Sequence, residues 1–256
     1  KKPPKGPYRR LLVAVDFSPS SLAALSLARV VAPRAEVVLL HAYAGQGKSA
    51  TAVEFARWYA LTGGLDPRYP LVLFSSFETH TDLNDVLNHI GQQTVPDWAS
   101  INQPDKKRQL VLRLLRQIPI LWIWDNVEPV AGFPAGTPSA WTGDEQQKLV
   151  DFLRQIRHDS ATQAKILLTS RRDEHDWLGG IPHRIAMPRM NPIDAGRLAL
   201  EIGSEHGLER GQLAHWQPLL DYCQGNPLTL RILTGQALRN GLRTQAQIAA
   251  FIQALR

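Results

Sequence analysis

One stretch of the chain limits its fold more than any other, and it covers residues 37–51, VVLLHAYAGQGKSAT. The valine- and leucine-rich run predicts a β-strand at 37–40, and the amphipathic pattern predicts a helix at 49–59. The turn between them ends in Gly47-Lys48-Ser49. A glycine-rich turn that leads from a strand into a helix points backbone N–H groups at a phosphate. The stretch therefore predicts a phosphate-binding loop.

The loop also predicts a nucleotide and a magnesium ion as cofactors. Lys48 would reach the terminal phosphates, while the hydroxyl of Ser49 would ligate magnesium. The full pattern G-x-x-x-x-G-K-[ST] has glycine where this chain has Ala42, which is tolerable if φ stays negative there. The alternative is a chance tripeptide in a surface turn, but the flanking strand and helix favour the loop. The predicted nucleotide-binding residues are Ala44, Gly45, Gln46, Gly47, Lys48, Ser49 and Ala50.

A second stretch supplies the other expected magnesium ligand. The apolar run at 120–124 ends in Asp125, whose carboxylate would hold the ion from the side opposite Ser49. Taken alone, this run would be a core strand with a capping acid, and the phosphate loop makes the ligand interpretation the better one. No second acid follows, because the next residue is Asn126. Glu128 is therefore the predicted base, and slow turnover or binding without turnover is expected.

Arg171 follows a predicted strand at 165–170, where its guanidinium would contact a γ-phosphate. The alternative is an arginine on the surface. The predicted catalytic residues are thus Lys48, Glu128 and Arg171. The histidines His41, His80 and His175 have no metal-ligand spacing, so magnesium is the only metal predicted.

Strands and helices alternate in the first part of the chain and predict an α/β fold. Further strands are expected at 71–75 and 184–186, and further helices at 82–90, 109–117 and 145–157. This alternation predicts a mostly parallel sheet covered on both faces. Only helices are expected afterwards, at 192–206, 216–223, 228–239 and 244–255. The predicted domains are a phosphate-loop domain at 37–189 and a small helical lid domain at 190–256, with Gly225-Asn226-Pro227-Leu228 opening a helix.

Composition fits a globular protein of the cytoplasm. Hydrophobic residues make up 44% and charged residues 20%, and no apolar run approaches the roughly 20 residues that span a bilayer. The single cysteine, Cys223, allows no internal disulfide. The net charge of +6 would suit a nucleic-acid-binding ATPase, but part of it lies in a basic arm at 1–10 that we expect to be disordered. Nucleic acid is therefore not an expected partner, and no membrane span or signal peptide is predicted.

Residues 37–256 contain four motifs whose combination and order resemble those of the signal-transducing STAND ATPases, the group that includes NB-ARC and NACHT modules. They are the phosphate loop, WIWDN at 122–126, LLTSRR at 167–172 and QGNPL at 224–228. The resemblance implies a P-loop NTPase fold that binds ATP and ADP as a conformational switch. Lys48, Ser49 and Asp125 would hold the nucleotide and magnesium, Arg171 would sense the γ-phosphate, and Pro227 would pack beside the adenine. The resemblance also implies a moving lid, neighbouring domains or protein partners, and oligomerisation on activation. A start without methionine and an end within a helical pattern favour a piece of a longer protein.

The opening segment resembles a different family. Residues 10–22, RLLVAVDFSPSSL, together with HA at 41–42, resemble the first βαβ unit of universal stress proteins. This implies an alternative function, an adenine-nucleotide-binding module at 11–42 without hydrolysis, in which Asp16 lies near the nucleotide. The glycine-rich phosphate motif of that family has no counterpart here, so Asp16 is interpreted as a strand-end or capping residue.

The two resemblances disagree about the strand at 37–40. A universal stress protein would pair it with a strand at 11–15, whereas a STAND ATPase flanks it with the strands at 165–170 and 184–186. We therefore predict that the 11–15 strand joins the sheet beyond 184–186 or lies outside it. The segment VVLLHA resembles both families, so a fused or engineered chain is a further alternative.

Overall fold

The computed structural model describes residues 37–66, 68, 70–134, 136–204 and 206–255. Their strands form one parallel five-stranded sheet in the order β2-β3-β4-β1-β5. The strands are β1 (Val37–His41), β2 (Val72–Ser76), β3 (Leu121–Asp125), β4 (Lys165–Ser170) and β5 (His183–Ala186). The five strands expected among the described residues are all present within one residue at each end, and the predicted α/β fold with a parallel sheet is confirmed.

The position of β1 within the sheet agrees with the STAND-like expectation. Leu39 lies opposite Leu168 of β4 on one side and Arg184 of β5 on the other. Both edges of β1 are therefore occupied. The expected basic arm at 1–10, and the part of the expected βαβ unit before residue 37, with its 11–15 strand, lie outside the described residues.

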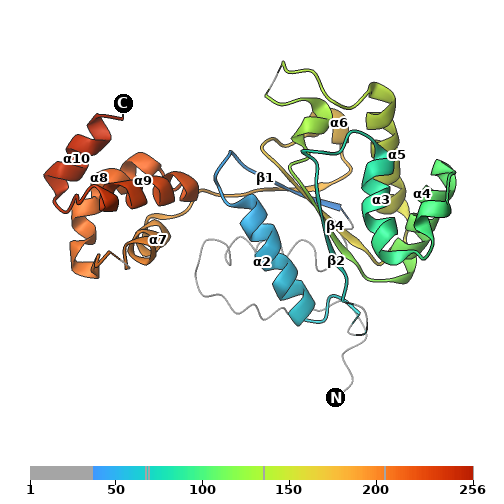
Figure 1. Cartoon of the computed structure of the whole chain (residues 1–256), viewed down its shortest axis with the longest axis horizontal. Coiled ribbons are helices and arrows are strands. Elements are labelled where there is room, and N and C mark those ends of the chain that lie inside the picture. The colour runs from blue at the N-terminus through green and yellow to red at the C-terminus, as the bar shows by residue number, and fades with distance from the viewer. Residues whose placement is uncertain (1–36, 67, 69, 135, 205, 256) are drawn as a thin grey trace.

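Helices cover both faces of the sheet (Figure 1). On one face lie α3 (Leu83–Thr94), α4 (Pro104–Gln117) and α5 (Gly143–His158), and on the other lies α2 (Lys48–Leu61). Both faces of β1 and β3 are buried, which explains why these strands read as continuous apolar runs. The core on the three-helix side includes Trp122, Trp124, Phe77, Phe152 and Ile90. The core on the α2 side includes Val38, Leu40, Phe55, Ile123 and Leu167.

The C-terminal part is helical, as expected, and Figure 1 shows it set apart from the sheet. It consists of α7 (Pro192–Ser204), α8 (Gln217–Cys223), α9 (Pro227–Arg239) and α10 (Gln245–Gln253). These helices enclose an apolar cluster of their own that includes Trp216, Leu219, Leu230 and Ile248. Burial raises the pKa of Cys223 to about 11, which keeps its thiol protonated and unreactive. The division into separate domains stays a prediction.

The helix boundaries differ from the sequence expectation in a few places. The expected helix at 109–117 begins at Pro104, because proline suits a first helical turn and Asp105 lies in that turn. A short helix, α6 (His175–Leu178), lies between β4 and β5 and was not expected. None of the helices in the described part of the chain has the length and apolar character that crossing a bilayer requires.

The α2 side of the core gives a direct test of the packing. Phe55 is 0% exposed and packs against Trp58 and Tyr59, whereas Val53 on the same helix is 38% exposed. Phe55→Ala should lower the free energy of unfolding by about 3–5 kcal/mol, because it leaves a cavity in the core. Val53→Ala should change it by less than about 0.5 kcal/mol. Urea unfolding followed by tryptophan fluorescence measures both, and similar losses for the two variants would contradict this packing.

Candidate functional site

The predicted phosphate loop links β1 to α2 as expected. The N–H group of Ala42 donates to Ser170 O at 3.2 Å, and Ala42 is not among the described non-glycine residues with positive φ. The backbone condition under which alanine is tolerable at that position is therefore met. Gly45 and Gly47 have φ values of +76° and +89°, which favour glycine. No side chain caps α2 at Gly47, so its first backbone N–H groups are available to an anion.

Lys48 lies at the start of α2 and is 7% exposed. Its ammonium group donates to Ala42 O at 2.9 Å and to Tyr43 O at 3.3 Å. Burial lowers the pKa of Lys48 below its ordinary value, and the carboxylate of Glu128 partly opposes this shift. A phosphate beside this ammonium group would favour its charged form.

Ser49 and Asp125 are brought together although they lie far apart in the sequence. The hydroxyl of Ser49 donates to the two carboxylate oxygens of Asp125 at 2.9 and 3.0 Å. A third residue, Thr169 on β4, donates to Asp125 Oδ1 at 2.6 Å. Hydroxyl and carboxylate oxygens are the ligands that magnesium prefers, so this donor set fits the ion. No group of three His, Cys, Asp or Glu side chains in the described part of the chain could hold a metal, so phosphates and water would complete the ligand shell.

Glu128 and Arg171, both predicted to be catalytic, are paired with each other. Nε of Arg171 lies 3.0 Å from Oε1 of Glu128, and the guanidinium lies 4.9 Å from the ring centre of Phe133. Glu128 is 2% exposed, and its Oε2 has no hydrogen-bond partner among the described residues. The pair therefore places one buried carboxylate beside a cation that also lines the cavity described below.

Asn126 contacts an acid that is absent from the residues predicted by sequence. Its side-chain amide donates to Oε1 of Glu78 at 2.9 Å, and its backbone N–H donates to Oγ1 of Thr169 at 3.1 Å. Glu78 lies just beyond β2, which pairs with β3. The available signal was its position three residues after the strand predicted at 71–75, since the carboxyl ends of parallel strands meet at one edge of the sheet.

The helical part contacts the phosphate loop at the start of α9. The side-chain amide of Asn226 donates to Ala44 O at 2.9 Å, and the N–H group of Leu228 donates to Gly45 O at 3.2 Å. Asn226 also caps α9 by accepting from Thr229 N, and Pro227 lies in the first turn. The predicted helix start is thus confirmed, and the same residues bind the loop backbone.

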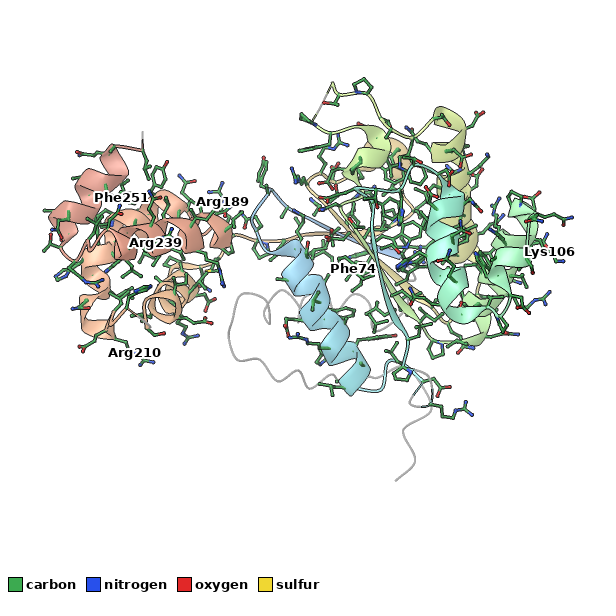
Figure 2. All side chains as sticks on the ribbon, in the orientation of Figure 1. Phe74, Lys106, Arg189, Arg210, Arg239 and Phe251 are labelled. Carbon is green, nitrogen blue, oxygen red and sulfur yellow. The ribbon has the colours of Figure 1, made fainter. Side chains whose placement is uncertain are left out.

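The connection from β5 to α7 is bonded to the loop that precedes α9. Figure 2 shows Arg189 on this connection, and its guanidinium donates to Gln224 Oε1 at 2.7 Å. The N–H group of Met190 donates to Gly225 O at 3.0 Å.

A cavity of about 730 Å³ lies between the phosphate loop and the helical part. The loop residues 44–50, Asn126 and Arg171 line its core side. Its helical side and connection are mainly apolar, with Met187, Met190, Leu198, Glu201, Pro227, Leu228 and Arg231. All the residues predicted to bind nucleotide line this cavity, whereas Glu128 and Asp125 lie behind it and contact lining residues.

These strands, this loop and this sheet order define the P-loop NTPase fold, and solved structures agree. The Walker-type ATPase PABY2304 of Pyrococcus abyssi has a TM-score of 0.63 at 14% identity, over 91% of this chain and 71% of that one. The ORC2 protein of Aeropyrum pernix has a TM-score of 0.55 at 15% identity, over 91% of this chain and 66% of that one.

A STAND protein with a tetratricopeptide repeat sensor, PH0952 from Pyrococcus horikoshii, is also similar. Its TM-score is 0.53 at 17% identity, and the match covers 80% of this chain but only 28% of that one. No protein-family model and no curated protein sequence matches this chain. At these identities the comparisons show the fold.

The two glycines of the loop give a matched test of its contact with α9. A Cβ on Gly45 would lie 2.8 Å from both Asn226 Oδ1 and Leu228 Cβ, whereas a Cβ on Gly47 would meet only Met187 Cε at 3.7 Å. Gly45→Ala and Gly47→Ala should both cost about 1–2 kcal/mol through positive φ. Only Gly45→Ala should also push α9 away and speed hydrogen exchange at Leu228 N–H. Equal exchange at Leu228 in the two variants would contradict this contact.

Proposed function

We propose that this chain binds ATP and ADP with magnesium and acts as a nucleotide-dependent conformational switch in signal transduction, with slow hydrolysis. The observation that carries the proposal is the cavity itself, because it joins a phosphate loop to a helical part bonded directly to that loop. The four motifs that resemble STAND ATPases, NB-ARC and NACHT modules included, favour ATP over GTP.

Each predicted residue has a role in this proposal. Backbone N–H groups of residues 44–50 and the ammonium of Lys48 would bind the phosphates. Ser49 and Asp125 would hold magnesium, which supplies charge neutralisation between the phosphates when bound. Pro227 and the apolar residues on the helical side of the cavity would pack against the adenine.

Arg171 would report the γ-phosphate. Its guanidinium already has one anionic partner, Glu128, and a γ-phosphate would compete with that partner for the same cation. ATP and ADP differ only in this phosphate. Arg171 would therefore contact the γ-phosphate when ATP is bound and Glu128 when ADP is bound. A ligand shifts an equilibrium between conformations only through such a difference.

The signal would pass to the helical part through the start of α9. Asn226 and Leu228 bond the carbonyl groups of Ala44 and Gly45, inside the loop that would close around the phosphates. A change in loop conformation would therefore alter both hydrogen bonds. The moving helical part would in turn change contacts with neighbouring domains or protein partners, and oligomerisation would follow activation.

Calorimetry with magnesium and ATP tests the proposed site. Lys48→Ala should weaken binding about 10- to 100-fold, which corresponds to the roughly 1.5–3 kcal/mol of a charge-assisted hydrogen bond. Lys106→Ala is the matched control, because Lys106 lies exposed on α4 on the far side of the three-helix layer (Figure 2) and should bind as the wild type does. Equal binding by the wild type and Lys48→Ala would move the nucleotide elsewhere and favour the stress-protein alternative.

A further inference from the structure

Hydrolysis of ATP needs a group that orients and deprotonates the attacking water, and the position after Asp125 holds an amide, Asn126. Besides Asp125, which contacts Ser49, two carboxylates contact residues that line the cavity. Glu128 contacts Arg171, and Glu78 contacts Asn126. The surroundings of the two carboxylates are very different.

Glu128 is poorly placed to exchange protons with water. Its side chain is 3% exposed, and its Oε1 lies 3.0 Å from the guanidinium of Arg171. Arg171 already engages one carboxylate oxygen, and the other oxygen is buried away from water. Glu128 therefore suits the task of holding Arg171 better than that of a base.

Glu78 lies at the same edge of the sheet in an open position. Ser76 pairs with Asp125 in the β2–β3 register, and the N–H group of Phe77 donates to Asp125 O at 2.9 Å. This pairing brings Glu78 beside Asn126. Oε1 of Glu78 accepts a hydrogen bond from the side-chain amide of Asn126 at 2.9 Å. Glu78 is exposed, and among the described residues no hydrogen bond reaches its Oε2, so this oxygen can face water.

The backbone explains why an amide follows Asp125. Asn126 has φ of +59°, in the left-handed region. Among residues other than glycine, asparagine and aspartate adopt this conformation most readily. The amide of Asn126, which itself lines the cavity, donates to the Glu78 carboxylate and holds it in place.

We propose that Glu78 is the base of the hydrolytic reaction and that Asn126 is its positioning residue. This inference rests on the proposed function. The water oxygen attacks the γ-phosphorus while one water proton passes to the Glu78 carboxylate. The bond between the γ-phosphorus and the bridging oxygen breaks, and ADP leaves with that electron pair. Inorganic phosphate is the second product, and the proton then passes from the exposed Glu78 to solvent.

Single-turnover hydrolysis of magnesium-ATP, measured beside calorimetric binding, tests the assignment. Glu78→Gln should bind ATP as the wild type does and hydrolyse it at least about 100-fold more slowly, as expected for loss of a general base. Glu54→Gln, on the exposed side of α2, is the control and should leave both quantities unchanged. Asn126→Ala should also hydrolyse ATP more slowly, because it removes the hydrogen bond that holds the Glu78 carboxylate.

Exchanging the carboxylate of Glu78 with the amide of Asn126 distinguishes a chemical role of Glu78 from a purely structural one. The double variant Glu78→Gln/Asn126→Asp keeps one carboxylate and one amide across the same hydrogen bond, with the acid moved to the position after Asp125. It should recover at least about 10-fold of the rate lost in Glu78→Gln, because the carboxylate then occupies position 126, which lines the cavity.

The outcomes distinguish the two proposals. If the wild type binds no ATP, the proposed function itself is wrong. Suppose instead that the wild type binds ATP. If Glu78→Gln then hydrolyses ATP at the wild-type rate, or if only Glu128→Gln is slower, the role of Glu78 is overturned and the proposed function stands. Binding without any turnover by the wild type overturns it as well, since no water would then be activated.

Discussion

The carboxylate of Asp125 is the contact on which the rest of the site depends. It accepts hydrogen bonds from Ser49 at the start of α2 and from Thr169 on β4, while it ends β3 itself. Three elements are therefore fixed around one buried acid at the carboxyl edge of the sheet. Because parallel strands all present their carboxyl ends at this edge, the phosphate loop, Asn126 and Arg171 converge there too.

The contact between the phosphate loop and α9 connects this edge to the helical part. It consists of one side-chain and one backbone hydrogen bond, both to carbonyl groups of the loop. Each net contribution of about 1 kcal/mol is small, so a change in the loop can outweigh it. A weak contact of this kind is compatible with the proposed switch, since the two conformations of a switch must be close in free energy.

Local patterns in the sequence predicted most of the fold but only part of the site. Apolar runs and helical periodicity located the strands and the main helices, and the loop motif located Lys48 and Ser49. The contact of Asn226 with Ala44 joins residues 182 positions apart, and no local pattern encodes it. Glu78 was missed for a related reason, because only the strand order shows that β2 lies beside β3. The pairing of Glu128 with Arg171 likewise depends on side-chain positions set by tertiary packing.

The most direct measurement of the central claim is hydrogen exchange along the chain with and without magnesium-ATP. Nucleotide held between the phosphate loop and α9 should slow exchange at the N–H groups of residues 45–50 and at the first turns of α9, with little change in α4. Protection confined to other segments, or no protection at all, would contradict the account.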